Sequence, residues 1–243
     1  MRAILDTTWA RGLIVPFLVL FFLLAVGTLW HNRRGSTPSR YLPAAALGLQ
    51  TALFLLAVYY AARLGAFSRD LASPGYILLG LLLGHLLFAI SLLVTHNVWR
   101  DAIVHFFDLG GFVRFLAETP TLIGRFIAVS FAEELIYRVA AQPLLVTLTG
   151  QAWLAILLVA AVFSIVHKHF FENELLQSVE FAGFSIVLGV LYHCFGSLSL
   201  VLVVHTVRNL ESVFLEYLLK AGELGDEALA LAELEQAYMK KSV

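Results

Sequence analysis

Seven long apolar runs, separated by short polar or glycine- and proline-containing breaks, dominate this chain. A bilayer core of roughly 30 Å needs about 20 apolar residues in a helix that crosses it. The sequence therefore predicts an all-α, polytopic transmembrane helical bundle of about seven spans, with six to eight compatible because the fourth run contains Pro143 and the last breaks are very short. The expected spans are 12–30, 41–62, 75–95, 120–148, 152–168, 179–195 and 197–219.

The composition agrees with a membrane environment and excludes several classes of function. Of the 243 residues, 60% are hydrophobic and 14% are charged, which is more apolar surface than a soluble fold of this size buries. The formal net charge of -1 gives no basic surface, so nucleic acid is not an expected partner. Cys194 is the only cysteine, which rules out an internal disulfide, and no Cys/His cluster indicates a structural zinc site.

Three parts of the chain differ in character. Between the third and fourth spans, Trp99, Ile103 and Phe106 share one helical face, which is typical of a segment in the headgroup plane. Lys and Arg are more frequent in the odd-numbered loops and the tail, which favours a cytoplasmic C-terminus. We expect N-terminal transmembrane helices and an interfacial segment over 1–118, core helices over 119–220, and an acidic, amphipathic, solvated helix over 221–243.

The fourth span contains two carboxylates and a guanidinium within two helical turns. A charged side chain in hydrocarbon costs several kcal/mol, so such groups usually face a protein interior or a water-filled cavity and serve a function. Glu134 and Arg138 are four residues apart and have the spacing of an ion pair, which is a structural role. Glu133 points about 100° away from Glu134 around the helix. Glu133 is therefore the carboxylate that is left for a cavity.

Two further spans contribute imidazoles and an amide. In the fifth span, Phe163 and His167 lie on one face, and in the seventh span His205 and Asn209 share a stripe. The expected bundle thus has a polar cavity between spans 4, 5 and 7. For the remaining polar candidates we expect packing or boundary roles, and for the thiol a small buried side chain rather than a nucleophile. These candidates are His85, His169, His193 and Cys194.

This set of side chains fits two kinds of hydrolytic chemistry. Glu133 in a pocket of low dielectric constant can act as general base on water, while histidines orient the water and an amide stabilises an oxyanion. Alternatively, Glu133, His167 and His205 can ligate a catalytic zinc ion that keeps one open position. The residues alone fit both. An HExxH motif and a GxSxG nucleophile elbow are absent.

Three motifs in order resemble the CAAX prenyl protease and bacteriocin-processing family of intramembrane endopeptidases, also called the ABI family. Its pattern of EExxxR, FxxxH and HxxxN is matched by Glu133-Glu134-Arg138, Phe163-His167 and His205-Asn209. The run from Gly189 to Leu198 before the last motif is also similar to the family. The resemblance covers roughly 122–219, less than half of the chain. Each motif alone is weak, whereas three in order on separate apolar helices are specific.

The resemblance implies roles for these residues. Glu133 would activate water, His167 would assist or position it, and His205 with Asn209 would form the oxyanion site, with Glu134, Arg138 and Phe163 as structural support. Family members are described as metalloproteases or as glutamate proteases. We favour the glutamate type, without a cofactor, because two histidines and an amide suit oxyanion stabilisation, and zinc is the alternative.

The resemblance also implies a multi-pass protein of the bacterial inner membrane or a similar membrane, acting on a membrane-associated peptide or protein in the lipid bilayer. Eukaryotic members cut prenylated C-terminal motifs, whereas many bacterial relatives have other substrates or act as immunity proteins. A transporter that uses the Glu/His cluster as a proton or cation relay is one alternative, and a non-catalytic immunity or interaction protein is another.

Overall fold

The computed structural model is helical throughout its ordered elements, which confirms the all-α prediction for the described residues 8–34, 42–69, 73–96, 103–104, 106–167 and 169–240. The chain forms two compact units: unit 1 contains 1–77 and 132–201, and unit 2 contains 78–131 and 202–243. The helices are α1 (Thr8–Arg34), α2 (Leu42–Arg63), α3 (Ala66–Arg69), α4 (Pro74–His96), α6 (Leu109–Glu118), α7 (Pro120–Glu134), the π-helix η2 (Leu135–Ala141), α8 (Gln142–Thr149), α9 (Ala152–Val166), α10 (His169–Glu172), α11 (Leu175–Phe195), α12 (Leu198–Leu224) and α13 (Glu227–Lys240).

All seven expected spans correspond to helices, but they differ in length. Four helices have the length and apolar composition to cross a membrane, and a bent pair adds a fifth if the pair is one span. The helices Leu47–Arg63 and Ala152–Val166 are apolar but shorter. The four are Gly12–Trp30, Pro74–Thr95, Leu175–Phe195 and Leu198–Leu224, and the pair is Leu109–Glu118 with Pro120–Thr149. These helices identify an integral membrane protein.

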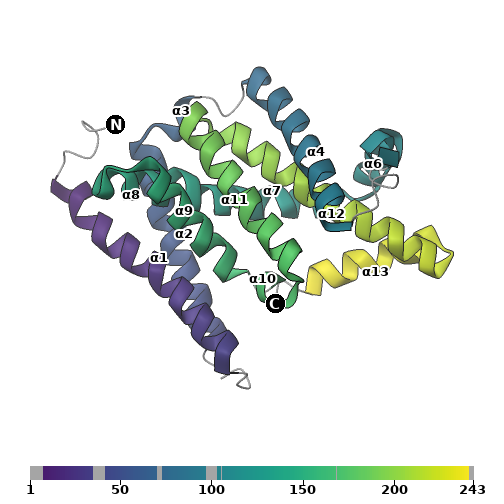
Figure 1. Ribbon diagram of the computed structural model, residues 1–243, viewed down its shortest axis with the longest axis horizontal. Coiled ribbons are helices and arrows are strands. Elements are labelled where there is room, and N and C mark those ends of the chain that lie inside the picture. The colour runs from purple at the N-terminus through teal and green to yellow at the C-terminus, as the bar shows by residue number, and fades with distance from the viewer. Residues whose placement is uncertain are drawn as a thin grey trace. The chain divides into compact units, whose positions relative to one another are not determined.

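Unit 1 is a bundle of apolar helices held by aromatic contacts. Helix α9 packs against α11, α8 and α1, as Figure 1 shows. Helix α2 packs against η2 and α1. The ring of Phe17 on α1 meets the edge of Tyr60 on α2 at 5.8 Å between centroids, and Phe21 meets Tyr137 on η2 at 5.6 Å. All four side chains are almost completely buried. Edge-to-face pairs of this kind fix the helices around η2.

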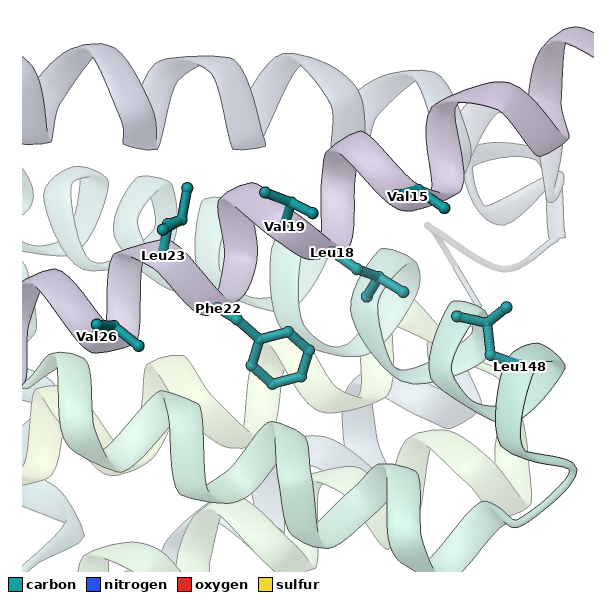
Figure 2. Close-up of a pocket in the computed structure, with 7 residues that line it drawn as sticks. All are labelled: Val15, Leu18, Val19, Phe22, Leu23, Val26 and Leu148. Carbon is teal, nitrogen blue, oxygen red and sulfur yellow. The ribbon is translucent and has the colours of Figure 1, made fainter.

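An apolar groove of about 440 Å³ runs along α1 where it meets α8. Figure 2 shows its lining, which consists of aliphatic side chains and one aromatic ring. Hydrocarbon is the solvent that such a surface requires, so the groove agrees with lipid contact on this side of α1. The lining residues are Val15, Leu18, Val19, Phe22, Leu23, Val26 and Leu148.

In unit 2 the chain bends by 95° between α6 and the helical run that begins with α7. Thr119 lies at the bend with non-helical torsion angles, φ -123° and ψ 50°, and its hydroxyl donates a hydrogen bond of 2.8 Å to the Phe115 carbonyl. Pro120 follows and has no N–H to continue the helical ladder of α6, but it fits the first turn of α7. The predicted span start at residue 120 is therefore set by this proline.

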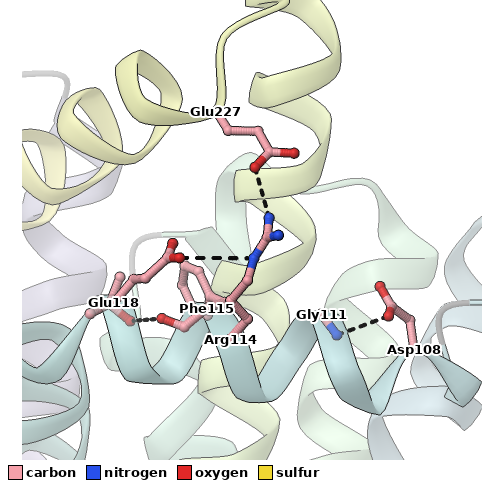
Figure 3. Close-up of polar contacts among 7 residues, drawn as sticks. Asp108, Gly111, Arg114, Phe115, Glu118 and Glu227 are labelled. Atoms are coloured by element: carbon pink, nitrogen blue, oxygen red, sulfur yellow. Dashed lines mark hydrogen bonds and ion pairs between the residues drawn. The ribbon is translucent and has the colours of Figure 1, made fainter.

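Helix α13 does not remain solvated on all sides, contrary to our expectation. Ala230 and Leu234 are fully buried against a cluster that includes Phe115 and Phe214. Figure 3 shows the guanidinium of Arg114 on α6 within 2.7 Å of the Glu227 carboxylate at the start of α13. Glu233 also forms an ion pair with Lys220 on α12, at 3.1 Å, so the helix is amphipathic but docked.

The hydroxyl of Tyr238 gives a second attachment between α13 and α12. It donates a hydrogen bond of 2.8 Å to Glu216 on α12. Burial, and then the neighbouring Glu216 carboxylate, raise the pKa of Tyr238, so the hydroxyl keeps its proton as a donor. The expected headgroup-plane segment is only partly described, because Trp99 lies outside the described residues, and that interpretation stays a prediction.

Candidate active site

The two adjacent glutamates at the end of α7 have different environments. The Glu134 side chain is completely buried, whereas the Glu133 side chain is 22% exposed. Helical geometry accounts for the difference, since consecutive side chains point about 100° apart. Of the two carboxylates, Glu133 is therefore the one that remains accessible, as its position on the helix predicts.

The side chain of His167 lies next to that of Glu133 in unit 1. Its Nε2 atom lies 3.3 Å from Oε1 of Glu133, and the imidazole is 22% exposed. The other ring nitrogen, Nδ1, donates a hydrogen bond of 2.6 Å to the carbonyl of Phe163. A carbonyl only accepts, so this bond places a proton on Nδ1 and leaves Nε2 as the atom that faces the carboxylate.

The end of α9 explains why His167 has this orientation. The helix ends at Val166, and His167 is its C-cap with extended torsion angles, φ -91° and ψ 118°. The backbone N–H of His167 bonds to the Ser164 carbonyl at 3.2 Å, one residue later than an α-helix requires. The carbonyl of Phe163 thus loses its helical donor, and the His167 side chain replaces it. Helix α9 therefore ends at Val166, before the end of the predicted span 152–168.

The ring of Phe163 holds the imidazole from the side. It lies 4.4 Å from the His167 ring and 5.4 Å from the ring of Phe181 on α11. Phe181 also contacts His167 edge-on, at 5.2 Å. The guanidinium carbon of Arg138 lies 5.2 Å from the Phe163 centroid on a cation–π contact. Phe163 thus connects the buried arginine to the histidine of the candidate site.

Arg138 is a completely buried cation with two kinds of partner. Its Nε atom lies 3.5 Å from Oε2 of Glu134, which is an ion pair at the spacing expected from the sequence, and its Nη2 donates to Ser185 on α11 at 2.9 Å. A buried charge is tolerated only when it is paired and hydrogen-bonded. This contact joins η2 to α11 beneath Glu133.

A π-helix follows the two glutamates directly. Over Leu135–Ala141 the backbone turns are widened, and the N–H of Gln142 bonds to the carbonyl of Tyr137, five residues earlier. The cause is Pro143, which has no N–H for the carbonyl four residues before it and whose ring pushes that carbonyl aside. One extra residue in the turn changes the direction of the side chains on either side of it. Such π-bulges are frequent at functional sites.

His205 and Asn209 lie on α12 in unit 2. His205 is 3% exposed. The Nδ2 atom of Asn209 donates a long hydrogen bond of 3.5 Å to Oγ of Ser130 on α7. Ser130 is buried, and sequence reasoning did not single it out. The structure thus brings Glu133 together with His167, and Asn209 together with Ser130; the cavity expected between spans 4, 5 and 7 stays a prediction.

The donor set supplies part of a zinc site. Glu133 and His167 provide an oxygen and a nitrogen ligand of the types that zinc prefers. Among the described residues of unit 1, no third His, Cys, Asp or Glu joins them in a group that could hold a metal ion.

Some of the other polar candidates lie where we did not expect them. His85 is not a simple packing residue, since it forms a buried pair with Glu211 in unit 2. Cys194 is exposed near the end of α11 rather than buried, and His193 beside it is exposed as well. The side chain of His169 lies outside the described residues. Glu211 was visible to sequence reasoning as a carboxylate inside an apolar run, but it has no motif partner.

The fold is that of a helical integral membrane protein. Its candidate site contains a partly exposed pair, Glu133 and His167, next to a buried ion pair, Glu134 and Arg138. Residues 115–210 match the family described as type II CAAX prenyl endopeptidase Rce1-like. The match agrees with the resemblance and includes all three motifs, so this part of the chain is similar to the type II CAAX prenyl endopeptidases. The similarity supports a CAAX-protease-like intramembrane peptidase as the general class. No curated protein and no solved structure shows a significant match to the chain.

Proposed function

We propose that this chain is an intramembrane endopeptidase in which Glu133 activates the water that attacks a peptide bond. The observation that carries the proposal is the contact of 3.3 Å between Oε1 of Glu133 and Nε2 of His167, in a pair that remains 22% exposed. The neighbouring Glu134 and Arg138 are fully buried and satisfy each other's charge. Only the first pair is accessible to water and substrate.

The hydrogen bonding of His167 supports a general-base role for this pair. Because Nδ1 donates to the Phe163 carbonyl, Nε2 is the nitrogen that faces the Glu133 carboxylate, and when His167 is neutral both of these atoms are acceptors. A water that donates a hydrogen to each would be held by both. Glu133 would take a proton from this water while the water oxygen forms a bond to the carbonyl carbon of the peptide. The proton would then pass to the departing amine as the C–N bond breaks.

We propose that His205 and Asn209 stabilise the oxyanion of the tetrahedral intermediate. This part of the proposal rests on the order of the motifs and on the spacing of four residues along α12. An amide has two N–H donors, and the contact to Ser130 at 3.5 Å occupies one of them through a long bond. Removal of one such donor typically costs about 10²–10³ in kcat.

The substrate that we propose is a membrane-associated peptide or protein, cut close to the bilayer. From the distribution of Lys and Arg we also propose a cytoplasmic C-terminus in a bacterial inner membrane or a similar membrane.

Comparison of peptide termini in membranes tests the proposed activity. Membranes from cells that express the wild-type chain, Glu133→Gln or Glu174→Gln are compared for new N- and C-termini of membrane proteins. Glu174 is an exposed carboxylate in unit 1, so its variant is the matched control. We expect the same new termini with wild type and Glu174→Gln and none with Glu133→Gln. Equal termini with Glu133→Gln, in protein that is folded, would reject the role of Glu133.

Metal analysis distinguishes the two catalytic types. A glutamate protease without metal would contain no stoichiometric zinc after purification without chelators. One zinc per chain that is lost in Glu133→Gln, His167→Gln and His205→Gln would instead assign these three residues as ligands and overturn the glutamate type.

A further inference from the structure

A second buried ionisable pair lies in unit 2, on helices α4 and α12. The Nδ1 atom of His85 lies 2.6 Å from Oε1 of Glu211, and Nε2 lies 2.9 Å from the backbone carbonyl of Phe106. The ring of Phe106 also stacks on the imidazole, at 4.3 Å between centroids. His85 and Glu211 both lie outside the residues that match the family. The pair is therefore a property of this chain that the peptidase motifs do not explain.

Glu211 is buried and His85 is partly buried. The Glu211 side chain is 3% exposed and that of His85 is 18% exposed. The Oε2 atom of Glu211 has no hydrogen-bond partner among the residues that the structure describes. Next to His85, a Cβ atom on Gly84 would lie 2.8 Å from Cβ of Val207, so α4 and α12 are in close contact at this level. The helices thus fix the distance between the imidazole and the carboxyl group.

The hydrogen bonds determine how many protons the pair holds. The Phe106 carbonyl can only accept, so Nε2 of His85 carries a hydrogen. With Nε2 protonated, the contact of 2.6 Å between Nδ1 and Glu211 needs one more proton. This proton is bound either to Nδ1, which then faces a carboxylate, or to the carboxyl group of Glu211, which then faces an unprotonated Nδ1. In both forms one proton is shared between the two side chains, in addition to the one on Nε2.

Loss of the shared proton is incompatible with both contacts. If Nε2 kept its hydrogen, the lone pair of Nδ1 would face the Glu211 carboxylate at 2.6 Å. If the hydrogen moved to Nδ1, the lone pair of Nε2 would face the Phe106 carbonyl at 2.9 Å. Each is an unsatisfied, repulsive contact in a buried place. One of the two contacts must therefore break.

On α4, the pair has no close titratable neighbour. No further titratable side chain occurs there between Tyr76 and His96, and His85 is the group whose charge acts on Glu211. The other titratable groups on the described parts of α12, α6 and α7 in unit 2 are His205, Arg208, Glu216, Tyr217, Lys220 and Glu223 on α12, Asp108 before α6, Arg114 and Glu118 on α6, and Arg125 on α7.

We propose that His85 and Glu211 form a buried proton-binding site that fastens the chain at Phe106 to α4 and α12. With the shared proton bound, both contacts hold. When it leaves, the remaining hydrogen of the imidazole goes to Nδ1, because a carboxylate accepts a hydrogen bond more strongly than a neutral carbonyl does, and the contact to the Phe106 carbonyl breaks. The release matters for α6, because Asp108 follows directly and its carboxylate caps that helix by accepting from the N–H of Gly111 at 3.0 Å, as Figure 3 shows. The site thus couples pH to the start of α6.

Hydrogen–deuterium exchange tests the proposal on the full-length protein in lipid nanodiscs between pH 5 and pH 10. Wild type is compared with Glu211→Gln, whose amide donates to a neutral His85 without a titrating proton. We expect the protection factor of a peptide that covers Phe106 to Gly111 to fall about tenfold or more in wild type as pH rises, and to stay constant in Glu211→Gln. Glu216→Gln is the matched control, because it changes a carboxyl of α12 outside the pair, and it should follow wild type.

Two results would overturn the proposal. Identical pH profiles in wild type and Glu211→Gln, including two flat profiles, would show that the shared proton does not hold the segment. The second measurement is a ¹⁵N-histidine NMR spectrum of folded wild type at neutral pH. The signal that is missing from the spectrum of His85→Gln is assigned to the imidazole of His85. We expect the Nε2 of His85 to carry a hydrogen; a bare Nε2 with a hydrogen on Nδ1 alone would contradict the proton count.

Discussion

The Nε2 atom of His167 lies 3.3 Å from Oε1 of Glu133, in a pair that a single aromatic residue holds in place. Phe163 contributes twice, since its carbonyl accepts from Nδ1 of the imidazole and its ring packs against the same imidazole at 4.4 Å. The same ring accepts the guanidinium of Arg138. The FxxxH spacing is therefore a geometric requirement, because a side chain four residues later is the one that reaches this carbonyl.

Substitution of His167 should affect the chemical step more than substrate binding. In His167→Gln the amide cannot exchange a proton with Glu133, so we expect kcat on a peptide substrate to fall by about 10²–10⁴ while KM changes little. The exposed His193→Gln is the matched control and should retain wild-type kinetics. A loss confined to KM would indicate that His167 binds substrate and does not assist Glu133.

Removal of one partner from the buried Glu134–Arg138 pair should destabilise unit 1. In Glu134→Gln the fully buried Arg138 keeps its charge without a carboxylate partner, and breaking such a pair costs about 3–5 kcal/mol. The double variant Glu134→Leu/Arg138→Met should recover part of that loss. Unfolding by detergent denaturation, followed by circular dichroism, measures both. A single variant as stable as wild type would show that the pair contributes nothing to the fold.

Much of the fold follows from the sequence. A segment exposed to lipid must be apolar, and in lipid a helix is one of the few structures in which every backbone N–H and C=O group is hydrogen-bonded. Each expected span corresponds to a helix, and the run expected over 120–148 is helical over Pro120–Thr149. Glu134 and Arg138 form the ion pair that their spacing of four residues favours. These features are local, so periodicity and spacing are enough to predict them.

The features that sequence reasoning missed depend on tertiary contacts. Pro143 is visible in the sequence, but whether it produces a kink or a π-helix depends on how the freed carbonyls are satisfied. His85 and Glu211 are separated by 126 residues, and no local pattern links them. The acidic composition of the tail predicted full solvation. In the structure, the side chains of Ala230 and Leu234 are instead buried in the apolar cluster of unit 2.

Gly84 should tolerate no larger side chain, because α4 approaches α12 closely there. A Cβ would lie 2.8 Å from Cβ of Val207 and 3.0 Å from the carbonyl of Val204, and neither backbone nor a β-branched carbon can move aside easily. We expect Gly84→Ala to cost about 1–3 kcal/mol through overpacking. Gly124→Ala, in open space on α7, is the control and should be neutral or stabilising. Equal stability of the two variants would contradict this close approach.

The docked face of α13 should contribute to the stability of unit 2. Leu234 is fully buried among the aromatic side chains of α6 and α12, so Leu234→Ala should cost about 2–5 kcal/mol through lost burial and the cavity left behind. Leu229 lies on the same helix but is 48% exposed, and Leu229→Ala should change stability by no more than about 0.5 kcal/mol. Limited proteolysis of the tail and detergent denaturation measure the difference. If both variants lost the same stability, or if neither did, α13 would not be packed on this unit as a folded element.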